Sequence, residues 1–449
     1  MLQPQIFKAN DIRGVVAGDN PEWDADGARA LGAAFAAAFE LDGHEFLLGR
    51  DMREGGLELS LAFAEGARRL GASVVEIGPA STDQVWYASG ATGLPAVQFT
   101  ASHNPGQYNG IKFCLPHAAP ITPELMARIR GLSAADLPSA ATPGTARQQD
   151  TLADYAAYLH SLVDLDGLRR LRVVVDAGNG MAGHVTPAVL GPLNVDLIGL
   201  YLDLDGSFPN HSPNPLEPEN LVDARRAVVD HDADLGLVFD GDADRCFLID
   251  ERGEVIDPSV VTALIARSAL AREPGAAIVI NTVTSSAVAE VVEAAGGRVV
   301  VGPVGHTKLK ALMAQHNAVF GGEHSGHYYF RDFWGADTGM LAALHVLALL
   351  GHGDQPASAL AAAIPSYPAS GEINSTVVDA AGAMAMVADA FEGHQLDWTD
   401  GLLIRGDEWQ VSVRSSNTEP LLRLNVEARD KPTMTRLRDR ALAIIRGER

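Results

Sequence analysis

Three aspartates alternate with small residues in the segment Asp240-Gly241-Asp242-Ala243-Asp244, which ends in Arg245. In an extended loop, carboxylates at every second position can direct their oxygens toward one point, and carboxylate oxygens are preferred ligands of Mg²⁺ and Ca²⁺. Three unpaired anions this close together are costly without a cation. The spacing therefore predicts a divalent metal site, with a solvated acidic turn as the less favoured interpretation.

An EF-hand calcium loop is the obvious alternative, because Glu251 stands at the twelfth position counted from Asp240. Such a loop needs glycine at its sixth position, and this chain has Arg245 there. The residues before Asp240 also form an apolar run typical of a strand, whereas an EF-hand begins with a helix. The sequence therefore argues against an EF-hand.

A second candidate site is Thr100-Ala101-Ser102-His103-Asn104-Pro105, directly after the apolar run 96–99. Asn-Pro favours a turn, so Ser102 is predicted on a loop at the carboxyl end of a strand, where α/β folds bind ligands. Its hydroxyl can carry a phosphoryl group, with His103 as donor or orienting residue, although a plain polar turn fits equally well. The surrounding residues break the Gly-x-Ser-x-Gly pattern of a hydrolase nucleophile.

Downstream of this serine, Asn109-Gly110 is predicted to form a turn that leads into a strand carrying Lys112. Lys112 could return a positive charge to Ser102 or could simply be solvated.

Two further polar clusters follow predicted strands. Gly321–His327 combines glycines with Glu323, Ser325 and two histidines, a mixture suited to a polyhydroxylated ligand such as a sugar; a metal site made by the histidines is the weaker interpretation. Arg414–Pro420 places an arginine, hydroxyls and an amide on a predicted tight loop, where several donors can surround a phosphate. Alone, it is equally compatible with a polar turn.

The elements around these clusters alternate between strands and helices, which favours crossover connections and mixed or parallel sheets. Helices are predicted over 57–70, 82–91, 221–230, 286–295 and 306–315. Strands are predicted over 46–48, 74–77, 96–99, 173–175, 196–200, 235–239, 246–249, 277–280, 298–301 and 318–320. After residue 371 the pattern changes to short strands with polar turns, over 373–378, 401–404, 409–413 and 421–427.

This order predicts three successive α/β units followed by a smaller α+β domain. We place the domains at 1–145, 146–252, 253–364 and 365–449, with the Ala-, Pro- and Thr-rich stretch 133–150 as a linker and another linker near 365–370.

Composition restricts the class of protein. The chain has 449 residues, 47% of them apolar, and 34 basic against 57 acidic residues give a formal charge of −23. That charge argues against a general nucleic-acid binder. Two cysteines exclude a disulfide framework and a four-thiolate zinc site. The sequence shows neither a signal peptide nor an apolar stretch long enough for a bilayer, so we expect a cytoplasmic protein without a membrane partner.

Taken together, the clusters resemble the four signatures of the α-D-phosphohexomutase family, in the order found in that family. The matching segments are TASHNP at 100–105, DGDADR at 240–245, GEHSGH at 322–327 and RSSNTEP at 414–420, with support from KANDIRG at 8–14, GRDMR at 49–53 and VGH at 304–306. The resemblance spans nearly the whole chain. It implies four domains around a central cleft, three similar α/β domains and a smaller C-terminal one.

The resemblance also implies roles for individual residues. Ser102 would be phosphorylated, and Asp240, Asp242 and Asp244 would hold Mg²⁺ with a phosphoserine oxygen. The reacting end would be lined by Arg13, His103, Lys112 and Arg245. Glu323 and Ser325 would bind sugar hydroxyls, with His306 and His327 in the cleft wall. The phosphate that is not reacting would be held by Arg414, Ser416, Asn417 and Thr418.

The resemblance implies a reaction that interconverts mannose 1-phosphate and mannose 6-phosphate through a hexose 1,6-bisphosphate, which also serves as activator. It also implies activity on glucose phosphates. GEHSGHYYFRDFW at 322–334 looks most like phosphomannomutases. The alternatives are a phosphoglucomutase, a phosphoglucosamine mutase, a phosphoserine-forming phosphohydrolase and a Ca²⁺- or sugar-binding module.

Two positions depart from the family, Asn10 in place of a common tyrosine and Asn281-Thr282 in place of a lysine. The sequence is compatible with both a monomer and a homodimer.

Overall fold

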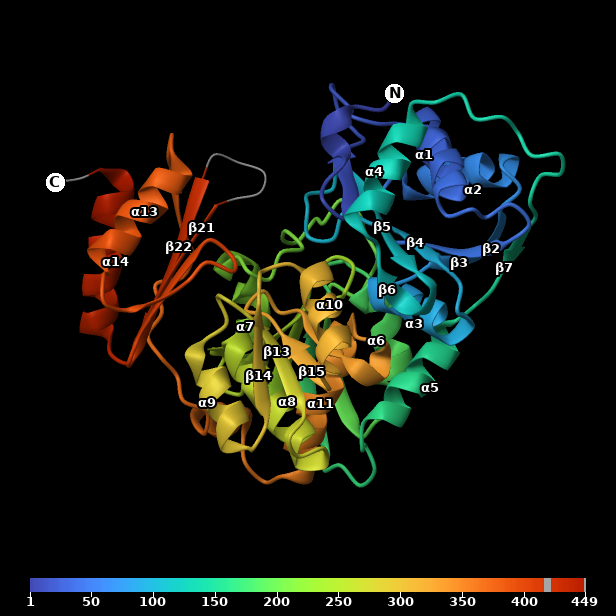
Figure 1. The fold of residues 1–449 in the computed structure, drawn as a ribbon. Coiled ribbons are helices and arrows are strands. Elements are labelled where there is room, and N and C mark those ends of the chain that lie inside the picture. Colours follow the sequence, from blue (N-terminus) through green and yellow to red (C-terminus); the bar gives the residue numbers. More distant parts are fainter. Residues whose placement is uncertain (416–420, 448–449) are drawn as a thin grey trace. The chain divides into compact units, whose positions relative to one another are not determined.

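The computed structural model describes residues 1–415 and 421–447 (Figure 1). They divide into two compact units, one formed by residues 1–256 with 325–359 and the other by residues 257–324 with 360–449. The first unit therefore includes a segment that rejoins it after the chain has built part of the second. Among the described residues, no helix has both the length and the apolar character that a membrane crossing requires.

The first sheet of the first unit has the strand order β1-β5-β4-β2-β3-β7, with β6 paired to β5. Strands β4, β2, β3 and β7 run parallel, whereas β5 is antiparallel to β1 and β4. The strands are β1 (Asp11–Val15), β2 (Glu45–Arg50), β3 (Ser73–Pro79), β4 (Ala96–Phe99), β5 (Tyr108–Leu115), β6 (Ala119–Pro120) and β7 (Ala146–Gln148). The central strands are apolar and buried, as expected for a parallel sheet covered on both faces.

Helices cover both faces of this sheet. Figure 1 shows α1 and α2 above it and α3 below. The helices are α1 (Ala25–Ala38), α2 (Gly56–Arg69), α3 (Thr82–Thr92) and α4 (Pro123–Ser133), with 3₁₀ turns η1 (Pro4–Ile6) and η2 (Pro116–Ala118). Side chains cap the N-termini of three of the helices. Asp24, Ser81 and Thr122 each accept a hydrogen bond from a backbone N–H of the first turn, which has no carbonyl partner within the helix.

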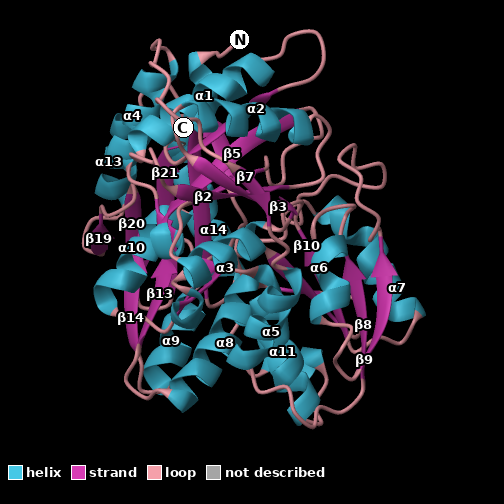
Figure 2. Ribbon diagram, turned by 90° about the vertical axis from the view of Figure 1, so that its right-hand side faces the viewer, coloured by secondary structure: helices cyan, strands magenta, loops and turns pink. Residues whose placement is uncertain are grey.

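The second sheet has the order β12-β11-β10-β8-β9. Its strands are β8 (Leu171–Asp176), β9 (Val195–Leu200), β10 (Leu235–Phe239), β11 (Cys246–Asp250) and β12 (Val255–Ile256). Its helices are α5 (Leu152–Leu162), α6 (Ala182–Val189) and α7 (Val222–Asp230), preceded by η3 (Pro218–Leu221). Figure 2 shows α6 and α7 on opposite sides of β8 and β9. The segment that rejoins this unit contains β16 (Tyr328–Phe330), η4 (Arg331–Phe333), β17 (Ala336–Asp337) and α11 (Gly339–His352).

The second unit contains a parallel sheet and an antiparallel one. In the parallel sheet, β13 lies between β14 and β15, and the elements are α8 (Pro258–Arg272), β13 (Ala277–Asn281), α9 (Ser286–Ala294), β14 (Arg298–Gly302), α10 (His306–His316) and β15 (Phe320–Gly322). After α12 (Ala357–Ala362), the antiparallel sheet has the order β18-β22-β21-β20-β19. Its elements are β18 (Ile373–Thr376), α13 (Ala380–Ala390), β19 (Gln395–Asp397), β20 (Leu402–Gly406), β21 (Trp409–Ser415), β22 (Leu421–Ala428) and α14 (Lys431–Arg446).

The predicted fold class, three α/β sheets followed by a smaller antiparallel domain, is confirmed. Four local predictions were wrong. The stretch 133–150 is only partly a linker, because β7 adds to the first sheet. Asn109-Gly110 is part of β5, since both residues pair with β1. The third-unit strand begins at Phe320 and takes in the two glycines, and Arg414 belongs to strand β21 instead of a loop.

Candidate active site

The serine loop leaves the end of β4 with an unusual backbone conformation. Ser102 has φ +50°, in the left-handed region that residues other than glycine rarely adopt. Its backbone N–H donates to the Thr100 hydroxyl at 2.9 Å, and the Asn104 N–H donates to the Ala101 carbonyl at 3.0 Å. Ser102 is buried. Short-range hydrogen bonds therefore support the loop and the backbone N–H of Ser102.

The acidic loop follows β10 in the second sheet and is also buried. Asp240, Asp242 and Asp244 each offer a carboxylate oxygen, and these oxygens lie within 4.8 Å of one another. A Cβ on Gly241 would lie 2.4 Å from the Ser102 carbonyl oxygen, so glycine is needed there for the acidic loop to approach the serine loop.

The two loops meet at a direct hydrogen bond. The Ser102 hydroxyl donates to Asp240 Oδ2 at 2.9 Å, and His103 Nδ1 lies 3.2 Å from Ser102 Oγ. Arg245 Nε donates to the same Asp240 oxygen at 2.9 Å. The Nη2 of Arg245 is buried and makes no hydrogen bond to the described residues. The two clusters proposed from separate parts of the sequence thus form one site, with a cationic donor available beside the serine.

Lys112 reaches the other two carboxylates from β5. Its Nζ lies 2.7 Å from Asp242 Oδ2 and 2.6 Å from Asp244 Oδ2. The Thr82 hydroxyl, at the start of α3, donates to Asp242 Oδ2 at 2.5 Å. Lys112 therefore faces the acidic loop and is not merely solvated.

Burial and charge act in opposite directions on these groups. Burial raises the pKa of Asp240 to about 7, against the opposing influence of Arg245. Burial also acts to raise the pKa of Asp242 and Asp244, but the pKa of both carboxyls is lowered, because Lys112 acts together with the Thr82 hydroxyl at Asp242 and with His327 and Arg245 at Asp244. Burial, followed by the charges of Arg245 and Arg13, holds the pKa of His103 well below its usual value, so its ring is neutral at pH 7.

The acidic loop fits a hard divalent cation. The Oδ1 atoms of Asp242 and Asp244 are buried and accept no hydrogen bond from any described residue. Buried carboxylate oxygens left in this way are energetically costly, and a cation with oxygen preference would satisfy them. Asp240, Asp242 and Asp244 are therefore suited to hold Mg²⁺.

Two more predicted residues lie in this unit beside the site. Arg13, on β1, donates to Asn104 Oδ1 and to Asp11 Oδ2, each at 2.8 Å, which places its guanidinium against the serine loop. His327 has Nδ1 2.9 Å from the Ser325 hydroxyl and Nε2 3.6 Å from Asp244 Oδ1.

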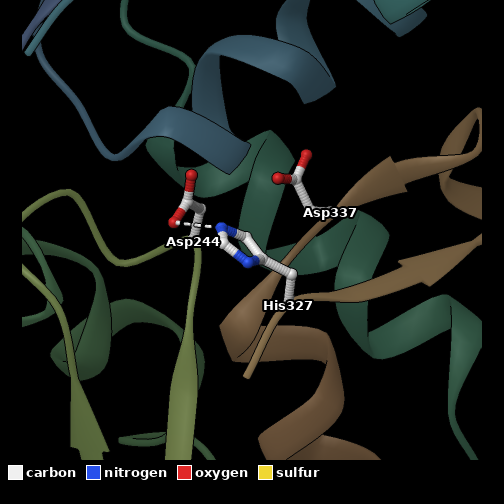
Figure 3. Close-up of side chains that lie close together, drawn as sticks. All are labelled: Asp244, His327 and Asp337. Carbon is white, nitrogen blue, oxygen red and sulfur yellow. Dashed lines mark ion pairs between the residues drawn. The ribbon is translucent and has the colours of Figure 1, made fainter. Parts of the chain in front are cut away.

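Figure 3 shows His327 with Asp244 and a further buried acid, Asp337. One ligand atom from each of these three residues also lies within 4.8 Å of the others. The sequence did not point to Asp337, because it is not part of any of the four clusters and only the hairpin of β16 and β17 brings it near His327.

The remaining predicted residues belong to the second unit. Buried Glu323 accepts from Asn281 Nδ2 at 2.8 Å and from the Gly305 N–H at 3.4 Å, and His306 is the first residue of α10. Arg414, on β21, pairs with Glu372 at 3.4 Å and Asp400 at 3.7 Å. Ser416, Asn417 and Thr418 lie outside the described residues.

Sequence reasoning did not identify Asn281 or Asp400 as supporting residues. The Asn281 side-chain oxygen accepts from the backbone N–H of Thr284 at 3.0 Å while its amide donates to Glu323. Asp400 accepts from the Val304 N–H at 3.0 Å and pairs with Arg414. No local signal marks either role, since Glu323 is 42 residues from Asn281 and Val304 is 96 residues from Asp400 in the sequence.

Models of known protein families match four successive parts of the chain. Four family models match in order: phosphoglucomutase/phosphomannomutase alpha/beta/alpha domain I over residues 4–137, domain II over 153–253, domain III over 257–367, and the C-terminal domain over 372–444.

Individual relatives match over nearly their whole length. The chain is 39% identical to a protein of Xanthomonas campestris named "Phosphohexose mutases", over 98% of this chain and 99% of that protein. It is 38% identical to the phosphomannomutase of Salmonella typhimurium, with the same coverage. A crystal structure of a phosphoglucomutase/phosphomannomutase family protein from Burkholderia thailandensis superposes with a TM-score of 0.91 at 32% identity, covering 100% of this chain and 99% of that one. The chain therefore belongs to the phosphoglucomutase/phosphomannomutase family, a family of intramolecular phosphotransferases that act on hexose phosphates.

Proposed function

We propose that this protein is a phosphomannomutase that interconverts mannose 1-phosphate and mannose 6-phosphate and also accepts glucose phosphates. The observation that carries the proposal is the hydrogen bond between Ser102 Oγ and Asp240, inside a cluster of three buried carboxylates. The preference for mannose rests on the likeness to the Salmonella typhimurium phosphomannomutase.

In the proposed reaction, Ser102 carries the phosphoryl group. The bond between Ser102 Oγ and phosphorus breaks as a sugar hydroxyl oxygen bonds to phosphorus, which yields a hexose 1,6-bisphosphate and a free serine. The bisphosphate turns over, and its other phosphate is returned to Ser102, leaving the isomeric monophosphate. Each transfer therefore conserves phosphate and restores the phosphoserine.

The groups around Ser102 have distinct tasks in this scheme. Asp240, Asp242 and Asp244 would hold Mg²⁺, which would supply neutralising charge to the transferring phosphoryl group. Arg13 and Arg245 add fixed positive charge on the protein side, which stabilises charge that develops during transfer. The proton released by the sugar hydroxyl passes to His103 or Lys112. His103 has a neutral ring that can accept it, whereas Lys112 must first release a proton that two carboxylates help it retain.

The same proposal assigns sugar and phosphate binding to other residues. Glu323 and Ser325 bind sugar hydroxyls, with His306 and His327 beside them. Arg414 binds the phosphate that is not reacting, together with Ser416, Asn417 and Thr418. We assign these tasks to domains 1–145 (phosphoserine), 146–252 (metal), 253–364 (sugar) and 365–449 (distal phosphate).

The test is to mix the purified protein with mannose 1-phosphate, Mg²⁺ and a trace of glucose 1,6-bisphosphate, and to measure mannose 6-phosphate and free phosphate. A mutase produces mannose 6-phosphate without steady release of phosphate. Steady free phosphate without the isomer would instead indicate a phosphohydrolase. We expect kcat/KM for mannose 1-phosphate and glucose 1-phosphate to differ by no more than about 100-fold, because the sugars differ in the orientation of one hydroxyl.

Ser102→Ala should lower kcat on the order of a thousandfold or more, since the phosphoryl carrier is removed while the fold remains. Ser60→Ala is a matched control, because Ser60 is equally buried in the same unit and donates only to the Leu57 carbonyl. Full activity in Ser102→Ala would overturn the proposal.

A further inference from the structure

Arg53 lies just past the end of β2, outside the residues assigned to the reaction, and its guanidinium is completely buried. An arginine side chain has five N–H donors in a rigid planar arrangement. In this protein all five have acceptors. Nε donates to Asp51 Oδ2 at 3.2 Å, Nη1 to the carbonyls of Pro105 at 2.8 Å and Tyr108 at 3.0 Å, and Nη2 to the carbonyls of Ser102 at 2.7 Å and Asn104 at 2.6 Å.

Four of the five acceptors belong to a single loop, residues 102–108, which carries the proposed phosphoserine. The Arg53 side chain therefore donates hydrogen bonds to four carbonyl groups that this loop directs inward. Asp51 compensates the buried charge and accepts a further hydrogen bond from the Arg53 backbone N–H at 3.0 Å. Other links to the loop include single hydrogen bonds, from Arg13 to the Asn104 side chain at 2.8 Å and from the Val16 N–H to the Gln107 carbonyl at 2.9 Å, whereas Arg53 alone binds four of its carbonyl groups.

The contact with the Ser102 carbonyl has a direct geometric consequence. Ser102 has φ +50°, and such a conformation persists only where the surroundings determine it. By holding the Ser102 carbonyl, Arg53 fixes the peptide that follows the strained residue. The orientation of that peptide determines where Ser102 Oγ lies, 2.9 Å from Asp240.

We propose that Arg53 is a positioning residue that holds the serine loop in the conformation required for phosphoryl transfer. It acts through the backbone of Ser102 and does not touch the sugar phosphate. The inference rests on the proposed function, because it concerns the same serine. Loss of the Arg53 side chain should slow the transfer step and leave substrate binding nearly intact, since misplacement of a reacting atom by about 1 Å can cost on the order of 100-fold in rate.

The test compares Arg53→Met and Arg53→Lys with the unmodified full-length protein. We expect kcat for mannose 1-phosphate to fall about 100-fold in Arg53→Met, with KM changed less than about threefold. Arg53→Lys should recover part of kcat, because lysine keeps the charge and up to three of the donors. Unchanged kcat in both variants, or a change confined to KM, would overturn the inference.

Hydrogen exchange supplies a readout that does not depend on activity. Amide exchange in residues 102–108 should accelerate in Arg53→Met, while exchange in β8 and β10 stays as in the unmodified protein. Equal acceleration throughout the first unit would mean a general loss of structure and would contradict a positioning role. If Arg53→Met does not fold, the same comparison is made with Arg53→Lys, in which exchange of residues 102–108 should accelerate to a smaller extent.

Arg169→Met is the matched control, because Arg169 also joins a carboxylate, Asp234, to a backbone carbonyl, that of Leu350. It should change neither kcat nor exchange in residues 102–108. The two proposals fail in different ways. Absence of mannose 6-phosphate from the unmodified protein would reject the mutase assignment, whereas normal turnover with unchanged loop exchange in Arg53→Met would reject only the role of Arg53.

Discussion

In the candidate active site, each buried carboxylate of the acidic loop lies beside a cationic side chain. Asp240 is matched by Arg245, and Lys112 lies between Asp242 and Asp244. Burying an ion is strongly unfavourable unless an opposite charge and good hydrogen bonds accompany it. Lys112 thus lets the acidic loop stay folded while leaving one oxygen of Asp242 and one of Asp244 available to a metal.

This balance leads to a prediction for Asp242→Asn. We expect the Mg²⁺ concentration for half-maximal activity to rise at least about tenfold, because one charged ligand is replaced by a neutral amide. Mg²⁺ binding measured by calorimetry should weaken in parallel. The melting temperature should change little, since Lys112 still pairs with Asp244.

Asp176→Asn is the control for this experiment. Asp176 is a buried aspartate outside the acidic loop, paired with His211. Its substitution should lower the melting temperature and leave Mg²⁺ binding unchanged. Unaltered Mg²⁺ binding in Asp242→Asn would remove Asp242 from the metal site.

A second prediction concerns Asp83, which is fully buried at the start of α3. Burial raises its pKa from 3.8 to about 6, although hydroxyls of Ser81, Thr338 and Tyr155 stabilise the carboxylate. The folded chain therefore binds this proton more tightly than the unfolded chain does. The resulting stabilisation is complete below pH about 4 and is lost as the pH rises through about 6, a change of roughly 3 kcal/mol.

Comparison with Asp83→Asn isolates this effect, because asparagine does not titrate. The melting temperature of the unmodified protein minus that of the variant should fall by a few degrees between pH 4 and pH 7. A difference that stays constant over this range would show that Asp83 titrates normally in the folded chain.

At the scale of elements, the contact of α1 with α2 depends on two glycines. A Cβ at Gly66 would lie 1.9 Å from the Arg29 carbonyl oxygen, and a Cβ at Gly32 would lie 1.9 Å from that of Phe63. The two helix backbones therefore touch directly. This close approach lets both helices pack on the first sheet. Strands β2 and β4 of that sheet lead into the loops that carry Arg53 and Ser102.

Gly66→Ala should consequently push the helices apart and destabilise the first unit by about 1–3 kcal/mol, the usual range for overpacking. Thermal unfolding measures the effect as a lowered melting temperature. Gly131→Ala is the control, because Gly131 lies in α4 with no neighbouring atom within 4 Å of an added Cβ. It should be neutral or stabilise the protein by up to about 1 kcal/mol. Equal melting temperatures for the two variants would contradict direct backbone contact at Gly66.

At the scale of the whole molecule, a chain of charge −23 must bind anionic hexose phosphates. The negative electrostatic field of the whole chain repels such ligands, so positively charged side chains near the binding site have to overcome this repulsion. In the second unit, the cation proposed for this task is Arg414, a buried residue of β21 that pairs with Glu372 and Asp400.

We therefore expect Arg414→Ala to raise KM for mannose 1-phosphate about tenfold or more and to change kcat by less than about threefold. The reason is that a clamp on the phosphate that is not reacting contributes equally to the ground state and the transition state. Arg405→Ala, which removes an arginine of the neighbouring strand β20 paired with Asp397, should leave both constants unchanged. A loss of kcat with normal KM in Arg414→Ala would instead assign Arg414 to the transfer step.

The sequence by itself determined the class of fold, the family and the polar clusters that form the candidate site. The strands Ala96–Phe99 and Leu235–Phe239 were predicted with the bounds that the structure has, because buried apolar runs are a local signal. The clusters at 100–105 and 240–245 could be identified for the same reason, since dense polar motifs after a strand are visible in a short window.

The tertiary structure alone decided which charges meet and how strongly they are perturbed. Lys112 is 130 residues from Asp242 in the sequence, and β7 joins the first sheet through pairing with β3. Four of the five contacts of the Arg53 side chain depend on the position of a loop that begins about 50 residues later. Composition and periodicity report on neighbours along the chain, whereas sheet order, burial and pKa depend on neighbours in space, which only the folded chain brings together.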